Sequence, residues 1–255
     1  MTIPTANLVS VPLAHKTVAW RIGLVVLSSD PTIEHSFQRM LAQTSDIALH
    51  CNRIAFDGEI SVSSLSTMMD RIEAVAAEIM PGQELDAILY GCTSASAAIG
   101  DDKVRASLIK GKAVASGSAH TPVSGLVAAL EVMKSKKISL ITPYPVDVTE
   151  MVAQYLGSMG VNVVALTCLG LKQDWQNGQI SADQIVDLAR SIDHKGADTL
   201  VLSCTALRGA EAIDEAEIAT GMKVISSNQA LLWHGLRKAG CDIRLNGFGE
   251  LLRTH

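Results

Sequence analysis

Ile88-Leu-Tyr-Gly-Cys92-Thr-Ser94 and Leu200-Val-Leu-Ser-Cys204-Thr-Ala206 are two forms of one stretch, an apolar run of strand length that ends in Cys-Thr. Two further pairs occur in the same order along the chain. A strand-like run that begins at Ile22 matches one that begins at Ile138, and residues 114–118 match residues 224–228. The members of the three pairs lie 116, 112 and 110 positions apart. Three matches in one order indicate that the chain consists of two similar halves.

The fold class follows from the same runs, because short β-branched segments alternate with longer helical patterns throughout the chain. This alternation is typical of βαβ units around a parallel sheet with helices on both faces. We therefore expect an α/β fold of two pseudo-symmetric parallel-sheet halves that face one cleft. The halves are residues 18–135, with Cys92, and residues 136–255, with Cys204. Within the first half we expect a helix over residues 61–80 and a strand over residues 113–115.

Composition and charge narrow the classes of partner. The 255 residues are 48% hydrophobic and 18% charged, which is enough for a packed core. The formal net charge is -5 and the Lys and Arg residues are scattered, which argues against nucleic acid as a partner. Apolar runs are far shorter than the roughly 20 residues of a membrane span, and no secretory leader pattern opens the chain. We expect a cytoplasmic protein that does not bind membranes.

The cysteines are five in number and form no CxxC pair, which argues against a disulfide scaffold or a zinc site. Cys92 and Cys204 each end a strand and precede an expected helix, so backbone N–H groups and a positive helix terminus would lie near each thiol. That setting favours the thiolate and offers hydrogen-bond donors to a substrate carboxylate. The alternative is a small buried hydrophobe, to which we assign Cys51, Cys168 and Cys241. The duplication of the strand-end Cys-Thr motif favours a functional role for Cys92 and Cys204.

Four motifs resemble those of one family, the branch of the aspartate/glutamate racemase superfamily that holds maleate cis-trans isomerases and arylmalonate decarboxylases. The resemblance extends from Ile22 nearly to the end of the chain, and a protein of ectoine utilisation in that branch is the nearest whole-chain resemblance. We expect a small carboxylate substrate and a homo-oligomer. The motifs are Gly91-Cys92-Thr93-Ser94, Thr142-Pro143-Tyr144, Ser203-Cys204-Thr205 and Gly247-Phe-Gly-Glu-Leu-Leu252.

What the resemblance implies is a two-thiol site between the halves that needs neither metal nor coenzyme. In racemases of this kind one thiolate takes the Cα proton while the other thiol delivers a proton to the opposite face. In maleate isomerases the first cysteine adds to the double bond, the resulting single bond rotates, and elimination gives fumarate. Arylmalonate decarboxylases keep only the second cysteine, with glycine at the first position, so the presence of Cys92 disfavours decarboxylation.

The sequence thus predicts a cofactor-independent isomerase or racemase of a small carboxylic acid, with Cys92 and Cys204 as catalytic residues. The substrate is either a maleate-type diacid or an amino-bearing acid. One alternative is an arylmalonate-type decarboxylase or another lyase with Cys204 as proton donor. A second alternative is a small-ligand binding module without catalysis, because two facing α/β halves also describe that architecture.

One departure from the family pattern bears on the substrate. Maleate isomerases tend to have Ser-Asn at the end of the first strand, where this chain has Ser29-Asp30. A carboxylate at this position would repel a dicarboxylate and suit an ammonium group, because like charges repel strongly in a partly dry site. The alternative is an ordinary helix cap ahead of Pro31, with Glu34 in the first turn. Both roles can hold together, since such a cap still faces the cleft.

The remaining predicted substrate contacts come from the strand-end turns. Tyr144 lies between two prolines, where its hydroxyl would donate to a carboxylate or an enolate oxygen; its alternative is a packed turn aromatic. Backbone N–H and hydroxyl contacts are expected from Thr93, Ser94, Thr205 and Ala206, with strand-to-helix capping as the alternative. We treat His120, in the loop after Ser118, as structural or as part of the rim of the cleft.

Overall fold

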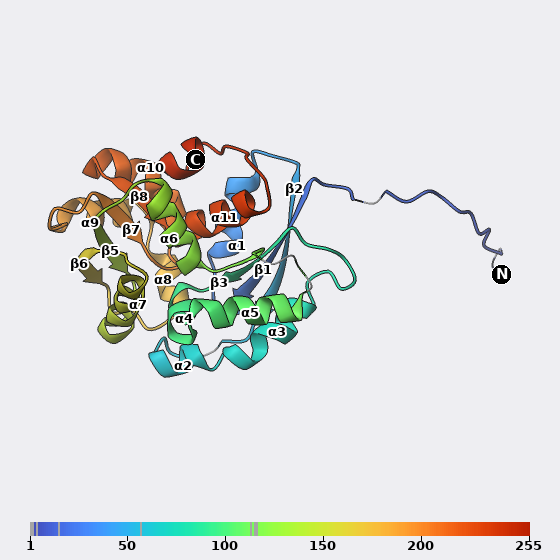
Figure 1. Cartoon of the computed structure of the whole chain (residues 1–255), viewed down its shortest axis with the longest axis horizontal. Helices are drawn as coiled ribbons and strands as arrows, with labels where there is room; N and C mark the ends of the chain where they lie inside the picture. The colour runs from blue at the N-terminus through green and yellow to red at the C-terminus, as the bar shows by residue number, and fades with distance from the viewer. Residues whose placement is uncertain (1–2, 4, 15, 57, 113, 115–116) are drawn as a thin grey trace.

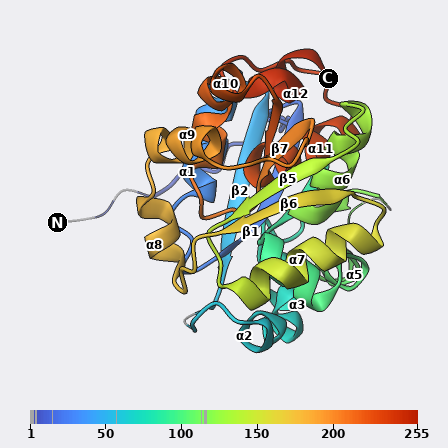
Figure 2. The same cartoon turned by 90° about the vertical axis from the view of Figure 1, so that its left-hand side faces the viewer.

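The computed structural model describes residues 3, 5–14, 16–56, 58–112, 114 and 117–255. Two parallel sheets of four strands each form the centre of the fold, with helices around them (Figures 1 and 2). Both sheets have the same strand order, in which the first strand of each half lies between the second and third. The first sheet is β2 (Ile47–Ile54), β1 (Trp20–Leu27), β3 (Ala87–Gly91) and β4 (Ala119–His120), and the second is β6 (Val163–Cys168), β5 (Ile138–Thr142), β7 (Thr199–Leu202) and β8 (Lys223–Ser226). The predicted α/β class with two parallel sheets is confirmed.

Strand register decides which loops become neighbours. The central strands of each sheet are apolar and buried along nearly their whole length, as expected for parallel strands covered on both faces. Val26 of β1 lies opposite Gly91 of β3, and Ile141 of β5 lies opposite Leu202 of β7. The segments that leave these strand ends therefore lie side by side, and each pair includes one of the two Cys-Thr turns.

Twelve helices occur in the described part of the chain, and α11 crosses from the second half to the first sheet. Helix α11 packs against β3 and β4 as well as against α6 (Figure 1). The boundary between residues 135 and 136 stays a prediction. The helices are α1 (Ile33–Leu41), α2 (Val62–Ser66), α3 (Met69–Ala77), α4 (Thr93–Ile99), α5 (Asp101–Gly111), α6 (Pro122–Val132), α7 (Val146–Ser158), α8 (Asp174–Gln179), α9 (Ala182–Ser191), α10 (Gly209–Thr220), α11 (Ser227–Lys238) and α12 (Gly249–Thr254).

The prediction of one continuous helix over residues 61–80 is wrong, because the segment forms two short helices, α2 and α3. The break lies in a run rich in hydroxyl side chains. Ser66 donates to the Val62 carbonyl and Thr67 donates to the Ser64 carbonyl. Such local side-chain bonds compete with the helical ladder of the backbone and end the first helix after five residues.

The expected strand over residues 113–115 lies for the most part outside the described residues, and Val114 is not in a strand. The fourth strand of the first sheet is described at Ala119–His120. Thr121 after this strand and Ser226 at the end of β8 both form capping boxes at the starts of long helices. The match of residues 114–118 with residues 224–228 is therefore displaced by a few positions in the first half.

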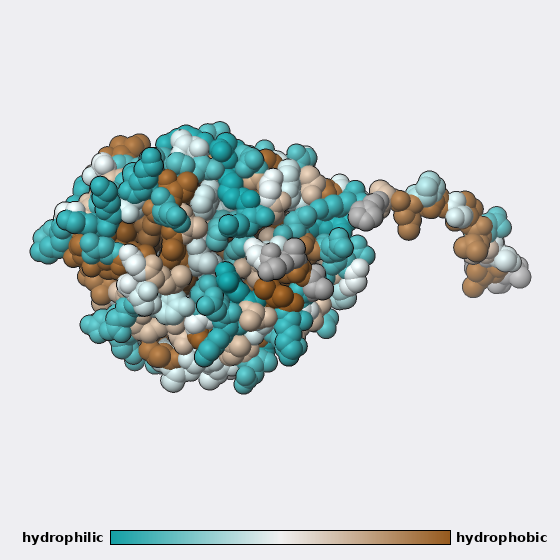
Figure 3. Space-filling model, in the orientation of Figure 1, coloured by the Kyte–Doolittle hydropathy of each residue, from teal (hydrophilic) through white to brown (hydrophobic). Residues whose placement is uncertain are grey.

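Helices α6 and α11 cross in close contact at Gly125. A Cβ atom at this position would lie 2.8 Å from the Ala230 carbonyl oxygen, so only glycine allows the two backbones to approach this closely. No described helix is both long and apolar enough to cross a membrane. The face drawn in Figure 3 mixes hydrophilic and hydrophobic side chains, with hydrophobic ones on its left side and along the extended segment at the N-terminus. Leu8 and Leu13 of that segment are exposed.

Candidate active site

Cys92 lies at the point where β3 ends and α4 begins. Its backbone is extended, and its sulfur accepts a hydrogen bond from the Ala95 N–H at 3.4 Å, so the side chain acts as the N-cap of the helix. The Ser96 hydroxyl donates to the Cys92 carbonyl at 2.6 Å and fixes the turn. The thiol is buried, with 4% of the residue exposed. The sequence prediction of a helix directly after this cysteine is confirmed.

Cys204 has a different local structure, because α10 does not begin until Gly209. The prediction of a helical first turn directly after Cys204 is therefore wrong. The intervening loop is held by neighbouring elements: the Thr205 hydroxyl donates to the Gly91 carbonyl at 3.1 Å, and the Asn228 amide donates to the Thr205 carbonyl at 2.9 Å. These bonds give the loop backbone partners outside a helix and hold it against the Cys92 turn.

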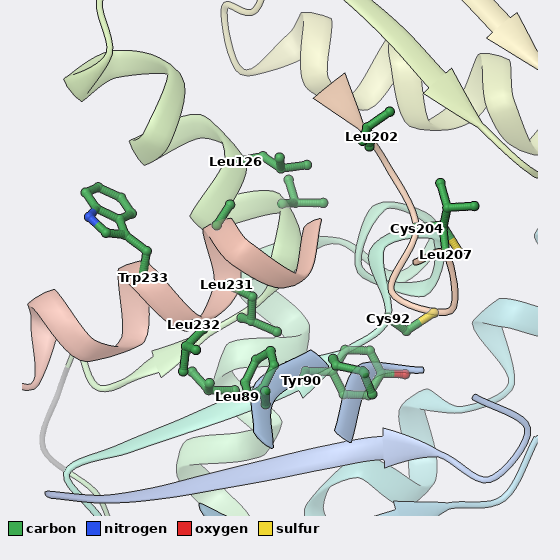
Figure 4. Close-up of a cluster of buried hydrophobic side chains, with 14 of the residues drawn as sticks. Leu89, Tyr90, Cys92, Leu126, Leu202, Cys204, Leu207, Leu231, Leu232 and Trp233 are labelled. Carbon is green, nitrogen blue, oxygen red and sulfur yellow. The ribbon is translucent and has the colours of Figure 1, made fainter. Parts of the chain in front are cut away.

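The two cysteines lie in one buried place between the sheets. Figure 4 shows Cys92 at the end of β3 and Cys204 on the loop after β7. Ionisation of Cys92 would raise the pKa of the Cys204 thiol, and both thiols influence the pKa of Tyr144, so all three groups are near neighbours. Cys204 and Ser94 both influence the pKa of the Tyr144 hydroxyl, so this hydroxyl lies beside them. The structure thus brings together four of the residues predicted to form the site.

Burial determines the protonation state of the two thiols. It raises the pKa of Cys92 to about 12, with a further increase from Asp174, and it raises the pKa of Cys204 well above 9.0. The hydrogen bonds from Ser94 and Ala95 to Cys92 lower its pKa, but by less than burial raises it. The prediction that the strand-end setting favours the thiolate is therefore wrong for the ligand-free site, because desolvation outweighs the helix terminus.

Asp30 caps α1 and faces the same place. Its Oδ1 atom accepts hydrogen bonds from the Thr32 N–H at 2.7 Å and the Ile33 N–H at 3.0 Å, so the helix-cap interpretation is confirmed. Burial raises the pKa of this carboxyl to about 6, opposed by the two backbone bonds and reinforced by the charge of Asp174. The charge of Asp30 in turn raises the pKa of both cysteine thiols, which shows that the cap lies beside them.

Asp174 and Asn177 belong to the site although the sequence analysis missed them. Asp174 begins α8 and accepts a hydrogen bond from the Ser29 hydroxyl at 2.5 Å. It is the charged group with the largest effect on the pKa of each of the two cysteines. The Asn177 amide nitrogen lies 3.9 Å from the Cys204 sulfur. The segment after β6 is polar and leaves the sheet at the same edge as the cysteine turns, which is the one feature of the sequence that points to it. It is not part of the motifs that repeat in the two halves.

Other predicted contacts connect structural elements to one another. The Thr93 hydroxyl donates to the Ser227 hydroxyl at 2.9 Å, and the Ala206 carbonyl accepts from the Thr32 hydroxyl at 2.7 Å. Both bonds join the first half to the second beside the cysteines. His120 is buried against His234, with ring centroids 4.5 Å apart, and takes no part in the thiol cluster. In the described part of the chain no three His, Cys, Asp or Glu side chains gather as metal ligands would.

Two parallel α/β sheets with buried cysteines and a tyrosine between them define a class of cysteine-dependent isomerases and decarboxylases. The chain belongs to the arylmalonate decarboxylase family, whose model matches residues 22–252. Within this family it is 28% identical to the maleate isomerase of Nocardia farcinica, over 91% of this chain and 95% of that protein. It is also 27% identical to the maleate isomerase of Pseudomonas putida, over 92% and 98% of the two chains.

Solved structures agree with these sequence relatives. A Cys-to-Ser variant of the Nocardia farcinica maleate cis-trans isomerase, which holds a covalently bound succinylcysteine intermediate, superposes with a TM-score of 0.85 at 26% identity. That superposition covers 92% of this chain and 99% of the other. The arylmalonate decarboxylase of Bordetella bronchiseptica matches over a shorter region, with 29% identity over 51% of this chain and 56% of that protein. The predicted branch of the racemase superfamily is thus confirmed.

Proposed function

We propose that this chain is a cofactor-independent isomerase of a small carboxylic acid that uses Cys92 and Cys204 as its catalytic pair. The observation that carries the proposal is the convergence of two duplicated strand-end thiols on one buried site beside Tyr144. The maleate isomerase relatives, one with a cysteine-bound intermediate, support chemistry at a thiol.

Two reactions fit a site of this kind. In a cis-trans isomerisation the Cys92 sulfur adds to one alkene carbon, and the electron pair of the double bond moves into the neighbouring carboxylate. The new single bond rotates, the pair returns, and the C–S bond breaks. In a racemisation one thiolate removes the Cα proton and the opposite thiol donates its own, so the two cysteines exchange protonation states. The Tyr144 hydroxyl is placed to hydrogen-bond with the oxygen that gains charge in either reaction.

Both reactions need one thiolate, whereas burial keeps both thiols protonated in the ligand-free site. Substrate binding must therefore supply the change that ionises one of them. A ligand acts in this way when it offsets the negative charges of Asp30 and Asp174, because both carboxylates raise the pKa of the thiols.

The test is proton exchange and isomer formation, followed by NMR in D₂O with maleate and with a panel of α-amino and α-hydroxy acids. Cys92→Ser and Cys204→Ser should each remove most of the turnover. Cys168→Ser is the matched control, because Cys168 also ends a strand but lies outside the thiol cluster. Undiminished turnover in either of the first two variants would refute the proposal.

A second candidate is a lyase that decarboxylates a malonate-type acid, with Cys204 as proton donor to the resulting carbanion. The family model supports it. Release of CO₂ from arylmalonates by the Cys92→Ser variant would favour this reaction over isomerisation.

The assembly and the cellular role belong to the same proposal. A homo-oligomer, a cytoplasmic location and a role in ectoine utilisation remain predictions. Light scattering of the purified protein tests the first, cell fractionation the second, and growth of a deletion strain on ectoine the third.

A further inference from the structure

The site beside the cysteines has an excess of hydrogen-bond acceptors. The Asp30 Oδ2 and Asn177 Oδ1 atoms are buried and have no partner among the described residues. Both residues are almost completely enclosed, with exposed fractions of 2% and 0%. The nearby Thr205 hydroxyl donates to the Gly91 carbonyl instead. Buried acceptors without donors are costly and therefore rare in folded proteins, so these two atoms indicate a missing group that donates.

Asp174 adds a second carboxylate to the same place. It is 7% exposed and accepts a hydrogen bond from the hydroxyl of Ser29, the residue that precedes Asp30; the Asn177 amide also lowers its pKa as a donor. Its charge raises the pKa of Asp30, which shows that the two carboxylates are close together. Arg53 is a neighbouring cation, but its guanidinium donates to the backbone carbonyls of Ser28 and Asp30 and pairs with the Glu34 carboxylate. Among the described residues no Lys, Arg or His side chain forms an ion pair with the carboxylate of Asp30 or Asp174.

The missing partner is consequently a cationic donor with several N–H groups. We propose that Asp30 and Asp174 form a binding site for a protonated amine, so that the substrate is a carboxylic acid that carries an ammonium group. This inference rests on the proposed function of the same site and names its substrate class. A primary ammonium group has three donors, and the two carboxylates offer acceptors for them.

The charges of the site distinguish this ligand from a dicarboxylate. A second substrate carboxylate beside Asp30 and Asp174 would place three negative charges together in a nearly dry site, where repulsion is strong. It would also raise the pKa of Cys92 and Cys204 further. An ammonium group has the opposite effect, because it offsets the two carboxylates and thereby lowers the pKa of both thiols. The amine thus promotes formation of the thiolate that the reaction requires.

Calorimetric titration of the full chain tests the proposal with matched pairs of ligands. Glycine, β-alanine, 4-aminobutanoate and aspartate are each compared with the counterpart in which hydrogen or hydroxyl replaces the amine. At least one amino acid should bind about tenfold or more tightly than its counterpart, the size expected of a charge-assisted hydrogen bond. Asp174→Asn and Asp30→Asn should each remove most of this discrimination.

Asp101→Asn is the control. Asp101 is also a buried aspartate at the start of a helix and burial likewise raises its pKa, but it influences neither cysteine. The Asp101→Asn variant should discriminate between the paired ligands as strongly as the wild type does. Tighter binding of the amine-free acids, or discrimination that persists in both Asp174→Asn and Asp30→Asn, would overturn the proposal.

The outcome separates this inference from the proposed function. Turnover of maleate that depends on Cys92, together with no preference for amines, refutes the amine site and leaves the two-thiol isomerase standing. Discrimination in favour of amines without any dependence of turnover on the cysteines refutes the isomerase and leaves the amine site standing.

Discussion

Replacing Asp30 by Asn should change how the stability of the fold depends on pH. Burial raises the pKa of Asp30 from 3.8 to about 6. The folded state therefore binds more protons than the unfolded state between these two values, so stability falls as the pH rises through this window. Each pKa unit corresponds to about 1.4 kcal/mol, which gives a loss of about 3 kcal/mol in the free energy of unfolding above pH 6.

Asp30→Asn removes this loss while its side-chain oxygen still accepts the Thr32 and Ile33 N–H groups that the aspartate caps. Urea unfolding of both proteins at steps from pH 3.5 to pH 7.5 measures the difference. The variant should gain about 3 kcal/mol relative to the wild type between the ends of this range, with most of the gain between pH 4 and pH 6. Parallel stability curves for the two proteins would refute the assignment of a raised pKa to this buried carboxyl.

Three further variants test other parts of the structure. Gly125→Ala should destabilise the protein by about 1–3 kcal/mol or more in thermal unfolding, because its Cβ would meet the Ala230 carbonyl; Gly157→Ala in α7, where a Cβ meets nothing within 4 Å, should cause no loss. Tyr144→Phe should lower kcat by about 100-fold with little change in unfolding, and an unchanged kcat would mean that the hydroxyl only packs. Burial lowers the pKa of His120 to about 3. Below about pH 6.5 the unfolded state therefore binds a proton at this imidazole that the folded state does not bind, and stability is lost as the pH falls. Replacing it by Asn should make the loss between pH 6.5 and pH 4 smaller by about 3 kcal/mol in urea unfolding, and an identical acid limb would contradict a buried neutral imidazole.

Duplication explains why the sequence revealed part of the site. Cys92 and Cys204 end equivalent strands of two sheets with the same strand order, so periodicity and repetition were enough to locate both. Asp174 and Asn177 lie on a six-residue helix. Their approach to the thiols depends on how α8 packs against the first half, which is a tertiary property that spacing along the chain does not encode.

The protonation state of the Cys92 thiol could not be predicted from the sequence, for a related reason. A helix terminus is visible in the local sequence, but the raised pKa of Cys92 comes from burial and from the charge of Asp174, which is 82 positions away along the chain. The helix terminus predicted a thiolate, but burial of the thiol in the tertiary structure keeps it protonated. Likewise, the hydroxyl-rich break between α2 and α3 shows side-chain bonds overriding an apolar periodicity that fits one long helix.

The position of α11 has a consequence for the synthesis of the protein on the ribosome. The first sheet is complete by His120, but α11, which covers β3 and β4, does not end until Lys238. The Trp20 side chain at the start of β1 likewise donates to the Ala239 carbonyl. The nascent N-terminal half must therefore wait, with an apolar face uncovered, while more than a hundred further residues are translated. Chaperone binding should be strongest during this interval, and it should end abruptly when the last helices leave the exit tunnel.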